Sequence, residues 1–247
     1  MYKISSIIAS IVIASLVACN NPKQNEIKES QPVAEQTKGL VQEVLTKEQR
    51  DALTPEQIIQ SFKEGNERFM NNDLTARDHS ALVRNSTNGQ FPKAVILSCL
   101  DSRVPVEDVF DRGIGDIFVG RVAGNFVNED LLGSMEFGCK VSGAKVILVL
   151  GHEHCGAIKS AIDDVKLSNI TAMLSKIRPV VEKTTYEGER TSDNPEFVHE
   201  VCENNIQYTM DQIRLNSPIL KEMEDNGEIK IIGGVYDMST GKVTFLE

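Results

Sequence analysis

The chain contains no tryptophan, and aromatic residues make up only 5% of it. This scarcity argues against the stacking platforms with which many proteins bind carbohydrates or single-stranded nucleic acids. Basic residues are outnumbered too, because 26 Lys and Arg stand against 36 Asp and Glu and leave a net charge of −10. A nucleic-acid partner is therefore not expected, since binding phosphates requires a basic face. The sequence also shows no repeat of about 20 to 50 residues, the period typical of repeat proteins.

Residues 1–19 differ in character from the rest of the chain. Lys3 is followed by an apolar run from Ile4 to Val17, which is shorter than the roughly 20 apolar residues that a membrane span needs. The run closes with Leu16-Val-Ala-Cys19, which resembles a bacterial lipobox, whose Cys is acylated and becomes the mature N-terminus. We expect residues 1–19 to be a lipoprotein signal peptide and Cys19 to be the lipidation site. An uncleaved anchor or an ordinary secretory peptide is the alternative.

Residues 20–50 are rich in Gln, Glu, Lys, Asn and Pro and show no sustained apolar period. Such a segment buries too little surface to offset its ordering entropy, so it is predicted to be a flexible tether. A short helix near Leu40 to Leu45 is the alternative. The lipid anchor would be the only membrane contact and would place the protein in the bacterial cell envelope. Asn20, rather than Asp, favours the outer membrane, with the domain facing the periplasm.

Residues 51–247 are enough for one domain with a sizeable core. Thr54 is predicted to cap a first helix, and further helices are expected from Asn128 and Gly156, over 170–177 with Pro179 ending it, over 195–214 and from Ser217. Strands are predicted at 94–99, 116–120, 145–150, 229–236 and 242–246, the last two forming a hairpin. This alternation predicts an α/β fold whose mostly parallel central sheet is flanked by helices and carries an antiparallel C-terminal edge hairpin.

Two polar clusters directly follow two of the buried strands. Cys99-Leu-Asp-Ser-Arg103 follows the first strand, and His152-Glu-His-Cys155 follows the third. The carboxyl ends of parallel strands are where open α/β sheets place their chemistry. Cys99, His152 and Cys155 are two thiolates and one imidazole, which suit tetrahedral zinc and leave its fourth position open. We therefore predict one zinc ion per chain at this edge of the sheet.

Asp101 and Arg103 accompany the first predicted ligand. The carboxylate of Asp101 can accept a hydrogen bond from the nucleophile, and the planar guanidinium of Arg103 can clamp that carboxylate with two bonds. These two residues are the predicted catalytic pair, although a structural ion pair is an alternative that could coexist with this role. His154 is expected to be a surface residue. Cys139 and Cys202 fall on apolar helix stripes and read as buried free thiols, while an oxidising compartment would permit a disulfide between them.

Three segments together resemble the β-class carbonic anhydrases, and the resemblance extends from about Glu56 to the C-terminus. They are Cys-x-Asp-Ser-Arg-Val-Pro from Cys99, Arg121-Val-Ala-Gly-Asn125, and Gly-His-x-x-Cys-Gly-Ala from Gly151. The resemblance implies a zinc lyase that hydrates carbon dioxide reversibly to bicarbonate and a proton, by attack of zinc-bound hydroxide. It also implies an α/β fold that assembles as a homodimer or a tetramer.

The same resemblance suggests further site residues. Asp101 could become a fourth zinc ligand in a closed state. Gln90 corresponds to a residue whose amide contacts bicarbonate, and Gly124 could shape the substrate pocket. Phe137 stands where many family members carry a Tyr whose hydroxyl approaches the bound ion, and a phenyl ring cannot donate that hydrogen bond.

Two other functions compete with carbon dioxide hydration. The first is hydrolysis of carbon disulfide or carbonyl sulfide, which the same fold and metal can support. The second is an inactive, zinc-stabilised binding module. Asp101 and Arg103 argue against the module, because a structural zinc site has no need of a clamped acid beside an open coordination position.

Overall fold

The computed structural model describes residues 39–246, so the predicted signal peptide, Cys19 and most of the predicted tether lie outside the described residues. Residues 39–50, part of the predicted tether, belong to the folded domain. Val41 forms an isolated bridge with Arg77, and helix α1 (Lys47–Asp51) begins at a capping box made by Thr46. Arg50 is buried. The domain therefore begins earlier than the predicted boundary at residue 51.

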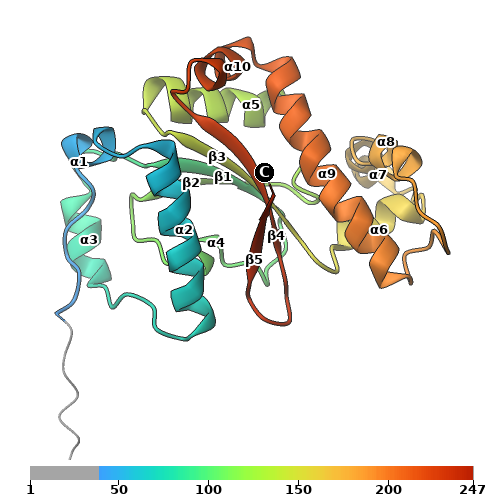
Figure 1. Cartoon of the computed structure of the whole chain (residues 1–247), viewed down its shortest axis with the longest axis horizontal. Helices are drawn as coiled ribbons and strands as arrows, with labels where there is room; N and C mark the ends of the chain where they lie inside the picture. The colour runs from blue at the N-terminus through green and yellow to red at the C-terminus, as the bar shows by residue number, and fades with distance from the viewer. Residues whose placement is uncertain (1–38, 247) are drawn as a thin grey trace, which may run out of the picture. The chain divides into compact units, whose positions relative to one another are not determined.

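The centre of the domain is a five-stranded sheet with the strand order β2-β1-β3-β4-β5 (Figure 1). The first four strands in this order run parallel, and β5 runs antiparallel to β4. The predicted α/β fold with its antiparallel C-terminal hairpin is thus confirmed. The strands are β1 (Ala94–Ser98), β2 (Ile117–Arg121), β3 (Val146–His152), β4 (Lys230–Tyr236) and β5 (Val243–Leu246).

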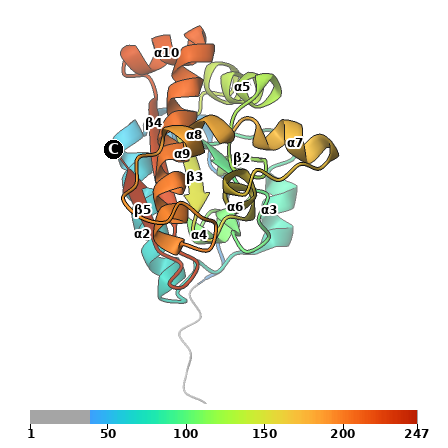
Figure 2. The same cartoon turned by 90° about the vertical axis from the view of Figure 1, so that its right-hand side faces the viewer.

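Helices cover both faces of this sheet, as Figures 1 and 2 show. Thr54 and Gln57 form the predicted capping box at the start of α2. Among the helices of residues 39–246, none is both long enough and apolar enough to span a membrane. The helices after α1 are α2 (Pro55–Met70), α3 (His79–Asn85), α4 (Val106–Val109), α5 (Glu129–Glu136), the π-helix η1 (Phe137–Val141), α6 (Gly156–Ile162), α7 (Ser168–Leu174), α8 (Arg178–Lys183), α9 (Pro195–Asn216) and α10 (Pro218–Asp225).

Alternate residues of the central strands pack on opposite faces, because side chains alternate along a strand. One set packs with α2 and α4, and Ile58 and Phe62 of α2 are fully buried there. The other set packs with α5, α9 and α10. A central sheet buried on both faces explains why β1 and β3 read as continuous apolar runs. The members are Ala94, Ile96, Val146 and Leu148 on the first face and Val95, Leu97, Ile147 and Val149 on the second.

Two predicted helices differ from those observed. The predicted helix over 170–177 is α7, which ends at Leu174, and Pro179 lies in the first turn of α8 instead of ending a helix. Proline fits a first helical turn because the amide proton it lacks would have no partner there. The helix from Asn128 passes into η1, a wider turn that the apolar spacing did not reveal.

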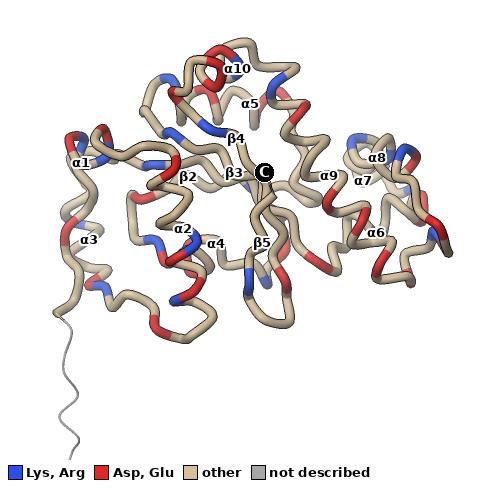
Figure 3. The backbone as a smooth tube through the Cα atoms, viewed as in Figure 1, with Lys and Arg blue, Asp and Glu red and all other residues tan. Residues whose placement is uncertain are grey.

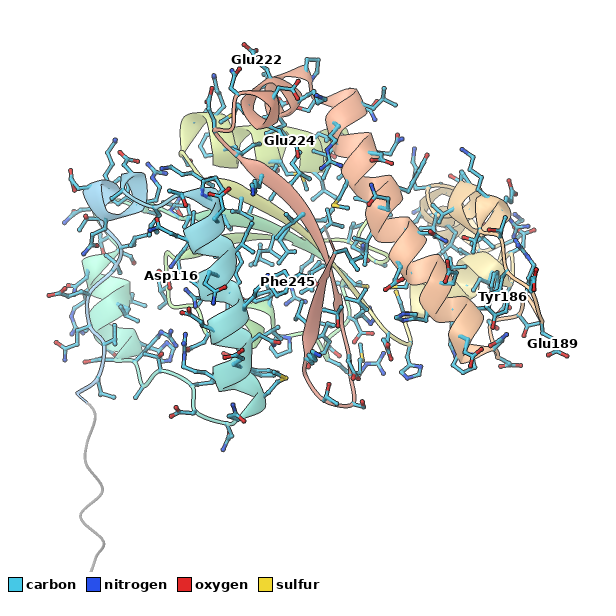
Figure 4. The ribbon with its side chains drawn as sticks, viewed as in Figure 1. Asp116, Tyr186, Glu189, Glu222, Glu224 and Phe245 are labelled. Atoms are coloured by element: carbon cyan, nitrogen blue, oxygen red, sulfur yellow. The ribbon has the colours of Figure 1, made fainter. Side chains whose placement is uncertain are left out.

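Charged residues are spread over the helices and loops, whereas the central strands are mainly uncharged (Figure 3). One ion pair joins the two helices at the end of the domain. Arg214 of α9 donates to both carboxylate oxygens of Glu224 in α10, at 2.8 and 2.9 Å, and Glu224 is labelled in Figure 4. This pair fixes one end of α9, the helix that packs on β3 and β4.

Candidate metal centre

The two predicted ligand clusters meet because β1 and β3 are parallel neighbours. Ser98, the last residue of β1, pairs with Leu150 of β3. Cys99 follows β1 directly, and His152 is the last residue of β3. Cys155 immediately precedes α6, as predicted. The sheet therefore places all three residues at the carboxyl edge of neighbouring strands.

The ligand atoms of Cys99, His152 and Cys155 lie within 4.8 Å of one another. All three residues are buried, with exposures of 4%, 1% and 1%. The two Sγ atoms are 3.9 Å apart. Tetrahedral zinc with Zn–S bonds of about 2.3 Å would separate two sulfurs by about 3.8 Å. The spacing and the soft donor set therefore fit a zinc ion.

The imidazole of His152 is oriented for metal binding. Its Nδ1 lies 2.8 Å from the carbonyl oxygen of Glu153. A carbonyl can only accept, so Nδ1 carries the proton and Nε2 keeps a free lone pair. Nε2 is buried without a hydrogen-bond partner among the described residues. Such an orphaned polar atom is costly, and a bound metal would satisfy it.

The side chains of the two cysteines contact each other. A hydrogen bond from Cys155 lowers the pKa of Cys99 to about 4, and the bond from the Gly124 amide acts in the same direction. The pKa of Cys155 is raised because its thiol is hydrogen-bonded to Cys99 and is buried. Zinc binds cysteine as the thiolate, so zinc binding at this pair would release protons.

Asp101 and Arg103 form the predicted pair. Oδ1 of Asp101 accepts bonds from the backbone nitrogen and Nε of Arg103, each at 2.9 Å, and Oδ2 accepts one from Nη2 at 2.8 Å. These bonds hold the pKa of Asp101 at about 2, so the side chain is ionised at neutral pH. Oδ2 lies 3.9 Å from Nε2 of His152, which places the carboxylate beside the ligand group.

Two contacts at the site were not assigned from the sequence. Arg121 donates to the carbonyl oxygens of Cys99, Asp101 and Val104, so it holds the loop after β1. The backbone nitrogen of Gly124 donates to Sγ of Cys99 at 3.3 Å. Both residues belong to the motif that starts at Arg121, but the motif alone did not reveal their partners.

Gln90, Phe137 and His154 form no hydrogen bond with the ligand group among the described residues. Gln90 is exposed in the loop before β1. Phe137 is 54% exposed and lines a cavity of about 580 Å³ with Phe118 and Leu131, and none of the three ligands lines this cavity. His154 is exposed, as predicted. Cys139 and Cys202 are buried free thiols, so the alternative of a disulfide between them is wrong.

An α/β sheet with a buried Cys-His-Cys group at its carboxyl edge, flanked by an arginine-clamped aspartate, defines a class of zinc enzymes. The carbonic anhydrase family model matches residues 94–243. The chain is 34% identical to carbonic anhydrase 2 of Mycobacterium tuberculosis over 74% of this chain and 88% of that protein. It is 31% identical to the carbonic anhydrase of Mycolicibacterium smegmatis, over 74% and 89%. The chain belongs to the carbonic anhydrase family.

Solved structures agree on the fold. A tetrameric β-carbonic anhydrase of Sordaria macrospora superimposes with a TM-score of 0.62 at 22% identity, over 68% of this chain and 86% of that one. The Coccomyxa β-carbonic anhydrase in complex with acetazolamide gives 0.60 at 24% identity, over 76% and 84%. The predicted β-class fold, its zinc cofactor and the hydration of carbon dioxide are thus confirmed. These matches favour hydration over the hydrolase and over the inactive module.

Proposed function

We propose that Asp101 contacts the nucleophile directly during hydration, while Arg103 acts through Asp101. Cys99, His152 and Cys155 would hold the zinc ion, and bound zinc would lower the pKa of a water molecule to about 7. Asp101 is ionised and has no proton to donate. It can therefore only accept a hydrogen bond from the nucleophile, which turns a lone pair toward the carbon of carbon dioxide. The geometry of the Arg103 clamp is the observation that carries this proposal.

Arg103 has a positioning role in this scheme. Two of its donors hold the two oxygens of Asp101, and its backbone nitrogen adds a third bond. The carboxylate therefore has little freedom to rotate, and preorganised groups of this kind lower a barrier without reorganising during the reaction. The alternative, in which Asp101 becomes a fourth zinc ligand in a closed state, would require Asp101 to leave Arg103.

The test is Asp101→Ala in the chain that lacks residues 1–19. Hydration is followed by stopped flow, and zinc content is measured on the same sample. Zinc should stay bound, since the three ligands are intact, while hydration activity falls by about 10²-fold or more, as for loss of one preorganised group. Asp164→Ala, which removes an exposed acid paired with Lys166 and Arg178, is the control and should remain at parental activity. If Asp101→Ala stays within about twofold of the parent, a difference of only about 0.4 kcal/mol in barrier, the proposed role is wrong.

We further propose that the chain works as a homodimer, or as a tetramer built from dimers, with β2 at the contact. β2 pairs only with β1 within the chain, and its other edge is free among the described strands. Phe137 and Val141, four residues apart in η1, are 54% and 69% exposed. Phe137 lines a cavity with Phe118 and Gly120 of β2, and exposed apolar side chains near an open sheet edge are typical of a subunit interface. The tetrameric Sordaria relative supports this assembly.

The predicted envelope location is also a proposal. Leu16-Val-Ala-Cys19 supports acylation of Cys19 and an anchor in the bacterial outer membrane, with the domain facing the periplasm. Mass spectrometry of the N-terminal peptide from native membranes tests it, with Cys19→Ser as the variant. Acylated Cys19 is expected in the parent. The Cys19→Ser variant should no longer be found in the membrane fraction but should still bind zinc. Unmodified Cys19 in the membrane fraction would contradict the lipoprotein assignment.

A further inference from the structure

Helix α9 contacts the end of β3, which carries His152, and the loop after β2, which contains Gly124. It is the long orange helix of Figure 1, and it runs alongside β3 and β4. Sγ of Cys202 donates to the carbonyl oxygen of His152 at 3.4 Å. Three residues later, Nδ2 of Asn205 donates to the carbonyl oxygen of Gly124 at 2.9 Å. Residues three apart in a helix lie on the same side, so one side of α9 bonds to the backbone of His152 and of Gly124.

Gly124 connects Asn205 to the ligand Cys99. Its carbonyl oxygen accepts from Asn205, and its nitrogen donates to Sγ of Cys99. Its φ of +82° is a conformation that favours glycine, and a Cβ there would lie 2.3 Å from Cδ1 of Ile177. The carbonyl and the N–H belong to different peptide groups, so the Asn205 bond acts by fixing the orientation of residue 124.

Asn205 occupies a position where an apolar residue would be expected to favour stability. The residue is 1% exposed and lies between Cys202 and Ile206 on the buried side of α9. Its Oδ1 has no hydrogen-bond partner among the described residues. Burying a half-satisfied amide costs free energy that a leucine of similar size would not incur. The hydrogen bond to Gly124 is therefore the interaction that asparagine makes at this position and leucine could not make.

We propose that Asn205 is a positioning residue of the metal centre, which holds the Gly124 amide against the Cys99 thiolate and thereby strengthens zinc binding. The proposal rests on the assignment of Cys99, His152 and Cys155 as the ligands. A hydrogen bond to a ligating thiolate spreads its negative charge and fixes its direction. Loss of such an outer partner typically weakens metal binding by about 10- to 100-fold.

The test compares Asn205→Leu with the parent in the full chain, using two readouts that do not depend on turnover. The first is zinc affinity, measured by competition with a chelator, and it should fall about 10- to 100-fold. The second is the near-ultraviolet charge-transfer band of the cobalt(II)-substituted protein. Because the thiolate loses its hydrogen bond, this band should shift to longer wavelength.

Two control variants separate positioning from general destabilisation. Thr209→Val removes another buried polar group one turn further along α9, whose Oγ1 has no partner among the described residues. Asn66→Leu removes a buried asparagine that bonds to Val109, Gly241 and Val243, away from the metal. Both controls should keep the parental zinc affinity and cobalt band, although Asn66→Leu should be less stable.

The cadmium-113 form of the parent gives a test that needs no variant. A scalar coupling between the metal and the Gly124 amide proton should be seen, because the proton bonds to ligand Cys99. The proposal would be overturned if Asn205→Leu kept the parental zinc affinity and cobalt band. It would also be overturned if Asn66→Leu showed the weaker zinc affinity and the shifted band expected for Asn205→Leu. Absence of the Gly124 coupling would overturn it as well. A parent that binds no zinc would instead reject the ligand assignment itself.

Discussion

At the scale of single residues, the metal centre depends on an imidazole that is almost fully buried and whose Nε2 has no partner within the described residues. We predict that His152→Ala loses its zinc on dialysis, because two thiolates alone cannot hold the metal with comparable affinity. The melting temperature should fall as well, since a metal that binds only the folded state stabilises it. Zinc content by atomic absorption and a thermal melt check both effects.

His154→Ala is the matched control, because His154 is exposed and lies two residues further along the same segment. It should keep one zinc per chain and the parental melting temperature. Full zinc occupancy in His152→Ala would remove this residue from the ligand set.

Asp111 is a second buried charge, and its role concerns stability. Its side chain is fully buried and accepts bonds from Arg68, Arg77 and Thr75. Burial raises the pKa of Asp111, but the bonds from Thr75, Arg68 and Arg77 outweigh burial and lower it from 3.8 to about 2. A lowered pKa in the folded state gives stability that is present above about pH 4 and is lost as the pH falls toward 2.

We predict that Asp111→Asn lowers the free energy of unfolding at pH 7 by about 3 kcal/mol, because two arginines lose their buried partner. The variant should also lose less stability than the parent between pH 4 and pH 2, since it lacks the titrating carboxylate. Urea unfolding at pH 7, 4 and 3 measures both effects. Asp130→Asn, at an exposed acid of α5, is the control. If the free energy of unfolding depended on pH equally in the parent and in Asp111→Asn, titration of Asp111 would not contribute to the pH dependence of stability.

At the scale of elements, α2 lies unusually close to the turn after α4. An added Cβ at Gly65 would stand 2.0 Å from the carbonyl oxygen of Phe110, which is backbone and cannot easily move. Alanine favours a helix over glycine by about 1 kcal/mol, but overpacking of this kind costs about 3 kcal/mol. The steric cost therefore exceeds the gain in helix propensity, and α2 is more stable with glycine at this position.

We predict that Gly65→Ala lowers the free energy of unfolding by about 2 kcal/mol, which is the difference between these two contributions. Chemical denaturation measures it. Gly133→Ala is the comparison, because Gly133 also lies in a helix, and a Cβ there would meet nothing within 4 Å. That variant should be neutral or stabilised, and a stabilised Gly65→Ala would show that α2 can move away from Phe110.

At the scale of the whole molecule, the exposed apolar residues Phe137 and Val141 belong to the proposed contact between subunits. We predict that Phe137→Arg shifts the protein toward monomer, since a desolvated charge in a subunit contact typically costs several kcal/mol. Sedimentation velocity over a range of protein concentrations measures the change. Leu215→Arg is the control, because Leu215 is 73% exposed in α9. An unchanged sedimentation coefficient for Phe137→Arg would place the contact elsewhere.

The sequence predicted most of the strands and helices and the Cys-His-Cys group that fits a zinc ion. Apolar runs predicted β1 and β3, and the Thr54 capping box predicted the start of α2. Cys99, His152 and Cys155 could be predicted because a ligand placed just after a strand is a local pattern, and parallel strands bring their ends together. The Asp101–Arg103 pair spans only two residues, so local chemistry was enough to predict it.

The tertiary structure decided the contacts between residues far apart in the chain. Asn205 reaches Gly124 across 81 positions, and Asp111 meets Arg68 across 43. The close approach of Gly65 to Phe110 is of the same kind. Periodicity and capping describe a residue's neighbours within one or two turns, whereas these partners are set by how whole helices pack on the sheet. For that reason the candidate zinc ligands could be predicted from the sequence. The contacts that position them, such as the bonds of Gly124 to Cys99 and to Asn205, appear only in the folded domain.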